Sequence, residues 1–208
     1  GDVAETMTNI CIVAPLIVRR EFCKTANGST YVIGMLHDPA AGDIGPDNPS
    51  PGWNGRLIIG YGGGVQANFH SGRSCGVSCN LAYLGDGGGQ GYQDIFIERG
   101  YATACGSLMV MGTNNDDVKS AETTLRVKER FAELYGAPEF SIGVGASGGS
   151  MQQLLIANNY PGLLDGIMPK RNYPDGISFL QPLHDCELLV HAAEDSDLHW
   201  TEAQLTAV

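Results

Sequence analysis

One serine in the sequence has neighbours that suit it to nucleophilic chemistry. The segment Gly145-Ala146-Ser147-Gly148-Gly149 matches the pattern G-x-S-x-G and follows a short β-branched run. A serine on a sharp turn from strand to helix needs small neighbours because the backbone doubles back, and this exposes its Oγ. The pattern favours Ser147 as a nucleophile and the N–H of Gly148 as an oxyanion donor. The alternative is a Gly-rich helix start that Ser147 merely caps.

A run of glycines earlier in the chain could supply the second oxyanion donor. Tyr61-Gly62-Gly63-Gly64 directly follows the apolar segment 56–59. A glycine loop at a strand end presents its N–H groups without a Cβ in the way, so Gly63 and Gly64 are the candidates. The run is similar to the H-G-G-G loop, with Tyr61 in the place of the histidine. A Walker loop would need Gly-Lys-Ser/Thr, and a dinucleotide fingerprint would need to open a helix.

These residues lie in an alternation of strands and helices that predicts an α/β fold. Turn signals and apolar runs predict strands at 10–13, 16–20, 30–36, 56–59, 101–110, 140–144 and 166–168, and helices at 94–99, 116–135 and 149–159. The first three strands form an antiparallel preface, and the later ones form a mostly parallel sheet flanked by helices. On helix 116–135, Val118, Ala121, Leu125, Ala132 and Tyr135 are expected to share the apolar face.

Composition and charge narrow the range of partners. The chain has 208 residues, 29 of them glycine, and a net charge of −11. This charge would repel a phosphate backbone, and the longest apolar run is too short for a membrane span. We therefore expect no nucleic-acid and no membrane partner.

Six cysteines indicate an oxidising compartment, so we expect a secreted or periplasmic protein. Their spacing predicts disulfides Cys11–Cys23 and Cys75–Cys79, while Cys105 is expected to be a free apolar residue of a buried strand. The partner of Cys186 stays open. Zinc binding by His70, Cys75 and Cys79 is a weaker alternative because a closed site needs a fourth ligand, and no metal site is predicted.

Three sequence blocks resemble the tannase and feruloyl esterase branch of the α/β-hydrolases, and most closely its tannase-like relatives of unassigned function. They are Trp53-Asn54-Gly55-Arg56-Leu57, the segment 145–150, and Asn159-Tyr160-Pro161-Gly162-Leu163-Leu164-Asp165-Gly166-Ile167. The resemblance covers about residues 53–175. It implies a secreted serine esterase with a lid inserted after the strand that follows Ser147. One departure is Ala146, where tannases usually have a cysteine paired with another beside the catalytic histidine.

The sequence leaves the catalytic acid and histidine open. His37 and His70 precede Ser147, whereas the superfamily order is serine, acid, histidine. His184, Asp185, His191 and His199 follow it, but they lie in the expected lid, where Pro182 opens an amphipathic helix with His184 and His191 on one face. Among these, His184, Asp185 and His199 are the in-chain candidates.

Too little chain follows Ser147 for the remaining strands of a hydrolase sheet, and a capping box at Thr201 starts a last short helix. We therefore expect residues 1–175 to be the N-terminal part of an α/β-hydrolase domain and 176–208 to begin the lid. A second polypeptide chain would complete the sheet and supply the acid and histidine. The predicted function is hydrolysis of a small or polymeric ester through an acyl-enzyme on Ser147, without a cofactor. A non-catalytic binding module of the same fold is the alternative.

Overall fold

The computed structural model describes residues 12–13, 16–24, 27–64, 92–172, 176–195 and 200–206. The chain divides into two compact units, Gly1–Asn172 and Tyr173–Val208. The first unit contains the sheet, and the described residues of the second unit form two helices.

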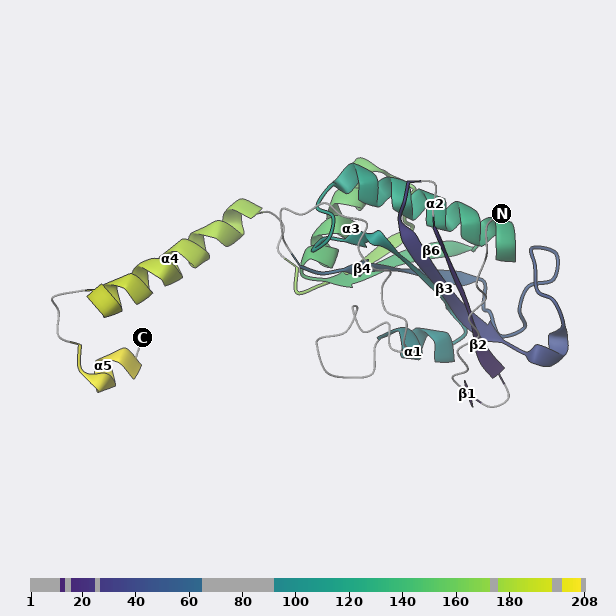
Figure 1. Cartoon of the computed structure of the whole chain (residues 1–208), viewed down its shortest axis with the longest axis horizontal. Coiled ribbons are helices and arrows are strands. Elements are labelled where there is room, and N and C mark those ends of the chain that lie inside the picture. Colours follow the sequence, from purple (N-terminus) through teal and green to yellow (C-terminus); the bar gives the residue numbers. More distant parts are fainter. Residues whose placement is uncertain are drawn as a thin grey trace. The chain divides into compact units, whose positions relative to one another are not determined.

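Within the described residues of the first unit, seven strands form one sheet in the order β1-β2-β3-β5-β4-β6-β7 (Figure 1). The strands are β1 (Ile12–Val13), β2 (Leu16–Lys24), β3 (Thr30–His37), β4 (Arg56–Gly62), β5 (Ala102–Val110), β6 (Phe140–Ala146) and β7 (Gly166–Lys170). β1, β2 and β3 pair antiparallel, and β3 also pairs antiparallel with β5. β4, β5, β6 and β7 run parallel. The predicted α/β fold, with an antiparallel preface to a mostly parallel sheet, is confirmed.

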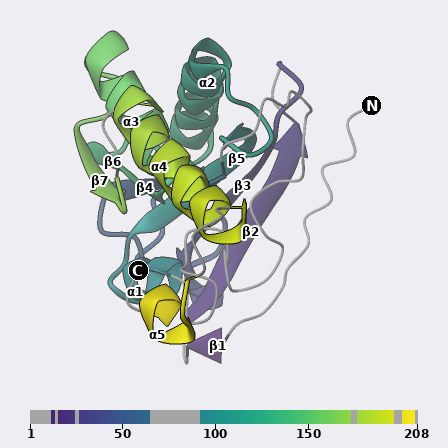
Figure 2. The same cartoon turned by 90° about the vertical axis from the view of Figure 1, so that its left-hand side faces the viewer.

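Helices cover both faces of this sheet. α2 (Asp117–Tyr135) and α3 (Gly148–Asn159) lie on one face, and the short α1 (Tyr92–Glu98) lies on the other (Figures 1 and 2). The central strands β4 and β5 are buried along nearly their whole length, as expected for parallel strands covered on both sides.

The main core lies between the sheet and the pair α2 and α3. Because side chains alternate along a strand, Tyr31, Ile33 and Met35 of β3 share this face, and so do Leu57, Ile59 and Tyr61 of β4. They pack with Phe131 of α2 and Ile156 of α3, among others. A smaller cluster of Val32, Cys105 and Val110 is separate from this core.

The buried face of α2 differs from the expectation. Val118 and Leu125 are 58% and 45% exposed, whereas Ser120, Thr123 and Thr124 are fully buried. The threonine hydroxyls donate to carbonyls one turn earlier, Thr123 Oγ1 to Lys119 O at 2.7 Å and Thr124 Oγ1 to Ser120 O at 2.8 Å. A hydroxyl bonded within its own helix can be buried at low cost. The predicted apolar face was therefore wrong at Val118 and Leu125 and right at Ala121 and Tyr135.

The second unit contains α4 (Gly176–Asp195) and α5 (Glu202–Thr206). α4 begins six residues before Pro182, so the prediction that this proline opens the helix was wrong. The predicted capping box at α5 is present: Thr201 N donates to Gln204 Oε1 at 2.9 Å, and Gln204 N donates to Thr201 Oγ1 at 3.3 Å. Among the parts of the chain that the structure describes, no helix combines the length and the apolar character that crossing a membrane requires.

Candidate active site

Ser147 lies between the end of β6 and the start of α3, in a backbone conformation that L-residues avoid. Its φ is 56° and its ψ is −121°. Arg171 is the other non-glycine residue with a positive φ among those described. Such a conformation costs about 1–3 kcal/mol and persists only where the surroundings hold it. The Ser147 side chain makes no capping hydrogen bond to α3. The structure therefore contradicts the alternative in which this serine only caps the helix.

The glycines around Ser147 allow β4 and the loop after it to approach closely. A Cβ on Gly149 would collide with Tyr61 O, and a Cβ on Gly148 would collide with Gly64 O. A Cβ on Gly145 would lie 2.6 Å from Tyr61 O. Each of these positions therefore needs glycine because another backbone segment occupies the space.

The glycine loop lies beside Ser147 and is fixed by two backbone hydrogen bonds. Gly62 O and Gly63 O accept hydrogen bonds from Met111 N at 3.1 Å and Gly112 N at 3.0 Å. In a trans peptide the N–H points opposite to the C=O, so the N–H groups of Gly63 and Gly64 point away from the segment 111–112. A Cβ on Gly63 would lie 3.7 Å from Ser147 Cβ. The predicted donors of the glycine run thus come beside the serine.

The N–H groups of the glycine loop and of Gly148 are candidate donors to a ligand. Among the turn, loop and cap hydrogen bonds that join described residues, none uses the N–H of Gly63, Gly64 or Gly148. The Gly148 N–H is at the N-terminus of α3, where the helix dipole favours negative charge. Donors on two sides of a serine hydroxyl can stabilise an oxyanion that forms on a carbonyl group attacked by that hydroxyl.

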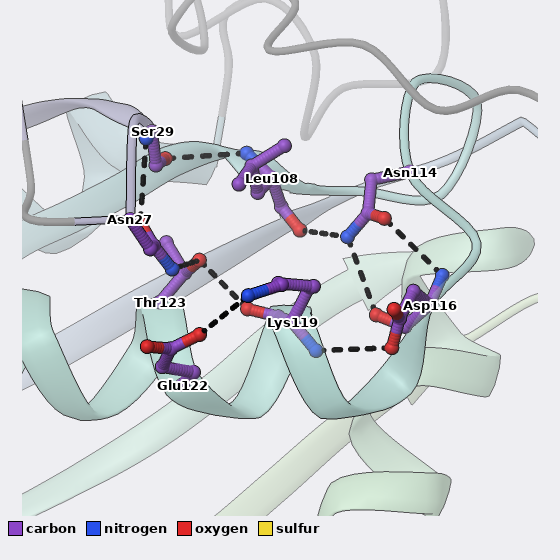
Figure 3. Close-up of polar contacts among 8 residues, drawn as sticks. All are labelled: Asn27, Ser29, Leu108, Asn114, Asp116, Lys119, Glu122 and Thr123. Atoms are coloured by element: carbon purple, nitrogen blue, oxygen red, sulfur yellow. Dashed lines mark hydrogen bonds and ion pairs between the residues drawn. The ribbon is translucent and has the colours of Figure 1, made fainter.

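The segment 111–116 that holds the glycine loop is itself fixed by a polar network (Figure 3). The fully buried Asn114 donates through Nδ2 to Leu108 O at 2.9 Å and accepts from Asp116 N at 3.3 Å. Asp116 in turn caps α2 by accepting from Lys119 N at 3.1 Å. The glycine loop is therefore connected to the end of β5 and the start of α2.

Tyr61 is a buried anchor of the same loop. Its hydroxyl lies 2.9 Å from Thr124 Oγ1 of α2, and the side chain is fully buried. Burial raises the pKa of Tyr61 well above its ordinary value, so the hydroxyl stays protonated. Tyr61 fixes β4 against α2 and cannot act as a base.

Within the described residues of the first unit, the one histidine, His37, does not lie near Ser147. His37 ends β3, and since β3 runs antiparallel to β5, this end lies at the sheet edge opposite Ser147. Its Nδ1 is buried without a hydrogen-bond partner. His184, Asp185 and His191 are exposed on α4 in the second unit. His70 and His199 lie outside the described residues.

The cysteines correct one expectation. Cys105 is disulfide-bonded, so the prediction of a free thiol was wrong. Cys186 is free and exposed. Cys11, Cys75, Cys79 and the side chain of Cys23 lie outside the described residues, as does the alternative zinc site with His70. Among the described residues, no three His, Cys, Asp or Glu side chains form a group that could hold a metal ion.

Sequence reasoning missed the residue that connects the two sides of the Ser147 turn. Gln153 is fully buried on α3. Its Nε2 lies 3.3 Å from Gly145 O and 2.8 Å from Gly149 O, and its Oε1 accepts from Met168 N at 3.2 Å. The alternation of apolar residues on α3 carries no signal for these contacts. An internal glutamine shortly after G-x-S-x-G is the one feature that could have pointed to it.

The third motif block contains a structural carboxylate. Asp165 Oδ2 accepts from Ser141 N at 2.7 Å and from Ser141 Oγ at 3.0 Å. The hydrogen bonds from Ser141 lower the pKa of Asp165. Since Ser141 is near the start of β6, this carboxylate lies at the edge of the sheet away from Ser147 and fixes the entry to β7.

The sequence matches one protein family over its whole length. Residues 1–208 match a family described as a tannase-like family of unknown function. No curated protein matches the sequence significantly. An acetyl xylan esterase from Paenibacillus sp. R4 is 12% identical with a TM-score of 0.47, covering 99% of this chain and 66% of that protein.

Two further solved structures are also distant likenesses. Brefeldin A esterase, a bacterial homologue of human hormone sensitive lipase, is 13% identical with a TM-score of 0.42, covering 86% of this chain and 49% of that one. Oligopeptidase B from Trypanosoma brucei is 16% identical with a TM-score of 0.40, covering 74% and 20%. The chain thus spans between one fifth and two thirds of the length of these proteins.

Proposed function

The chain belongs to a tannase-like family of unknown function, and on that premise we propose that it is a serine hydrolase that cleaves carboxylic esters. The observation that carries the proposal is the strained turn at Ser147, with φ 56° and ψ −121°, between a parallel strand and a helix. Among the described residues, the Ser147 side chain makes no capping hydrogen bond that would offset the backbone strain, whereas an exposed nucleophile requires such a turn.

The proposed reaction runs in two steps. Ser147 Oγ attacks the ester carbonyl carbon while a base removes its proton, and the carbonyl oxygen becomes an oxyanion. The N–H groups of Gly148 and of Gly63 or Gly64 donate to that oxyanion. The C–O bond to the alcohol then breaks, the alcohol takes the proton, and an acyl-enzyme remains. A water molecule attacks the acyl-enzyme in the same way and releases the acid. No cofactor takes part.

We propose that a second polypeptide chain supplies the acid and the histidine. What supports this is the position of His37, the one histidine among the described residues of the first unit, at the sheet edge opposite Ser147. The in-chain alternative uses His184 or His199 with Asp185. Native mass spectrometry of the active species tests the proposal. A lone 22.0 kDa species with full esterase activity would contradict it.

A fluorophosphonate probe with intact-mass readout tests the nucleophile. We expect one adduct on the wild-type protein, none on Ser147→Ala, and an undiminished adduct on Ser150→Ala. Ser150 is a matched control because it lies in the same Gly-rich segment but is fully buried. Labelling that persists in Ser147→Ala would contradict the assignment.

A non-catalytic binding module is the second candidate, favoured by the separation of Ser147 from His37. It predicts that Ser147 stays unlabelled in the native assembly while esters still bind without turnover. If the wild-type protein is labelled, a panel of aryl and aliphatic esters then defines the acyl and alcohol groups. The disulfide at Cys105 supports the proposal that the protein is secreted or periplasmic.

A further inference from the structure

The turn at Ser147 must be held in its strained conformation by something around it. Positive φ at a non-glycine residue relaxes unless neighbouring contacts fix the chain on both sides. On the strand side the chain is fixed by pairing of β6 with β4 and β7, and the Ser147 N–H donates to Lys170 O at 3.1 Å. On the helix side, the first turn of α3 contains two glycines and has no side-chain cap. On this side Ser147 O accepts from Ser150 N at 2.9 Å and from Met151 N at 3.1 Å, and a side-chain contact adds to these backbone bonds.

Gln153 provides that contact across the turn. One atom, Nε2, donates to Gly145 O before Ser147 and to Gly149 O after it. The oxygen of the same amide accepts from Met168 N in the neighbouring strand β7. A single planar amide thus connects the end of β6, the first turn of α3 and β7.

The surrounding glycines leave room for this side chain. A Cβ on Gly145 would lie 3.0 Å from Gln153 Nε2, and a Cβ on Gly143 would lie 3.2 Å from Gln153 Cγ. Two glycines of β6 thus face the glutamine and leave it the space it fills. The fully buried amide has both its donor and its acceptor engaged, which makes its position well defined.

We propose that Gln153 is a positioning residue for the nucleophile: its amide holds the two sides of the Ser147 turn together and so keeps Oγ beside the oxyanion donors. This inference rests on the proposed function. It adds a residue that touches neither the substrate nor the reacting atoms and acts through the backbone of residues 145–149.

The test compares Gln153→Met with Gln152→Met. Gln152 is the matched control, since it is the adjacent glutamine, is 1% exposed, and makes one long hydrogen bond, at 3.4 Å, to Asn114 O. Methionine has a similar length but no amide. For each variant, the free energy of unfolding in urea is measured together with the second-order rate constant of fluorophosphonate labelling at Ser147.

We expect Gln153→Met to lower the labelling rate constant about 10- to 100-fold, because small displacements of a reacting group have effects of this size. We expect Gln152→Met to lower stability but to leave the rate constant at the wild-type value. An equal fall in both variants, or none in Gln153→Met, would overturn the proposal.

A second measurement does not depend on catalysis. Hydrogen exchange of the Ser147 N–H should be faster in Gln153→Met than in Gln152→Met, because the turn is released on one side. If the wild-type serine is unreactive, the proposed function fails, and exchange alone decides on Gln153. Equal exchange in the two variants would then overturn its role.

Discussion

Replacing Ser147 with glycine should stabilise the protein even though it removes the proposed nucleophile. The φ of 56° and ψ of −121° cost a serine about 1–3 kcal/mol, and glycine adopts positive φ freely. Against this, glycine has more freedom in the unfolded chain, which costs about 0.5–1 kcal/mol. The Ser147 side chain makes no capping hydrogen bond whose loss would offset the gain.

The expected net gain is about 1 kcal/mol, or about 2–4 °C in melting temperature for a protein of this size. Urea unfolding of Ser147→Gly and Ser147→Ala measures it, since alanine keeps the Cβ and thus the strain. Ser150→Gly is the control for an ordinary helical position, where glycine should lower stability by about 0.5 kcal/mol. If Ser147→Gly is no more stable than Ser147→Ala, the turn stores no strain and the reasoning fails.

Three further predictions concern the buried contacts and the cysteines. Tyr61→Phe removes the hydroxyl and should lower the free energy of unfolding by about 1 kcal/mol. Because the hydrogen bond between Tyr61 and Thr124 is then already lost, adding Thr124→Val should lower the free energy of unfolding only a little further. A double variant that loses the full sum of the two single losses would contradict the contact. Because the pKa of Asp165 is lowered in the folded state, its contribution is present at neutral pH and is lost as the pH falls through the folded-state pKa. Urea titrations of Asp165→Asn should therefore show lower stability at pH 7 and a weaker decline at acid pH, and an unchanged pH profile would count against it. Peptide mapping without reduction should find Cys105 in a disulfide and Cys186 as a thiol; the reverse would refute both assignments.

Much of the fold could be predicted from local patterns. The apolar runs 56–59 and 101–110 identified β4 and β5, and the predicted helix 116–135 fitted α2 closely. The position of G-x-S-x-G between a strand and a helix could be predicted equally well. These features depend on neighbours in sequence, so a single sequence carries them.

The remaining features depend on partners far apart in the chain. The buried face of α2 contains hydroxyls because Thr124 contacts Tyr61, which lies 63 residues earlier. Gln153 looks like any polar helical residue until β7 is placed beside it. Likewise, Cys105 reads as an apolar strand residue, and its disulfide depends on which segment comes next to β5. The spacing of apolar residues along the sequence does not reveal such contacts.

The hydrogen bonds that Gly62 O and Gly63 O accept bear on whether the glycine loop is already in place before a ligand binds. Met111 and Gly112, which donate to them, follow directly on β5, a strand buried along its full length. Moving the glycine loop would require breaking hydrogen bonds to one of the most buried elements of the sheet. In the proposed reaction, the dipoles of this loop would be oriented before the substrate binds, so little reorganisation energy would be spent on them.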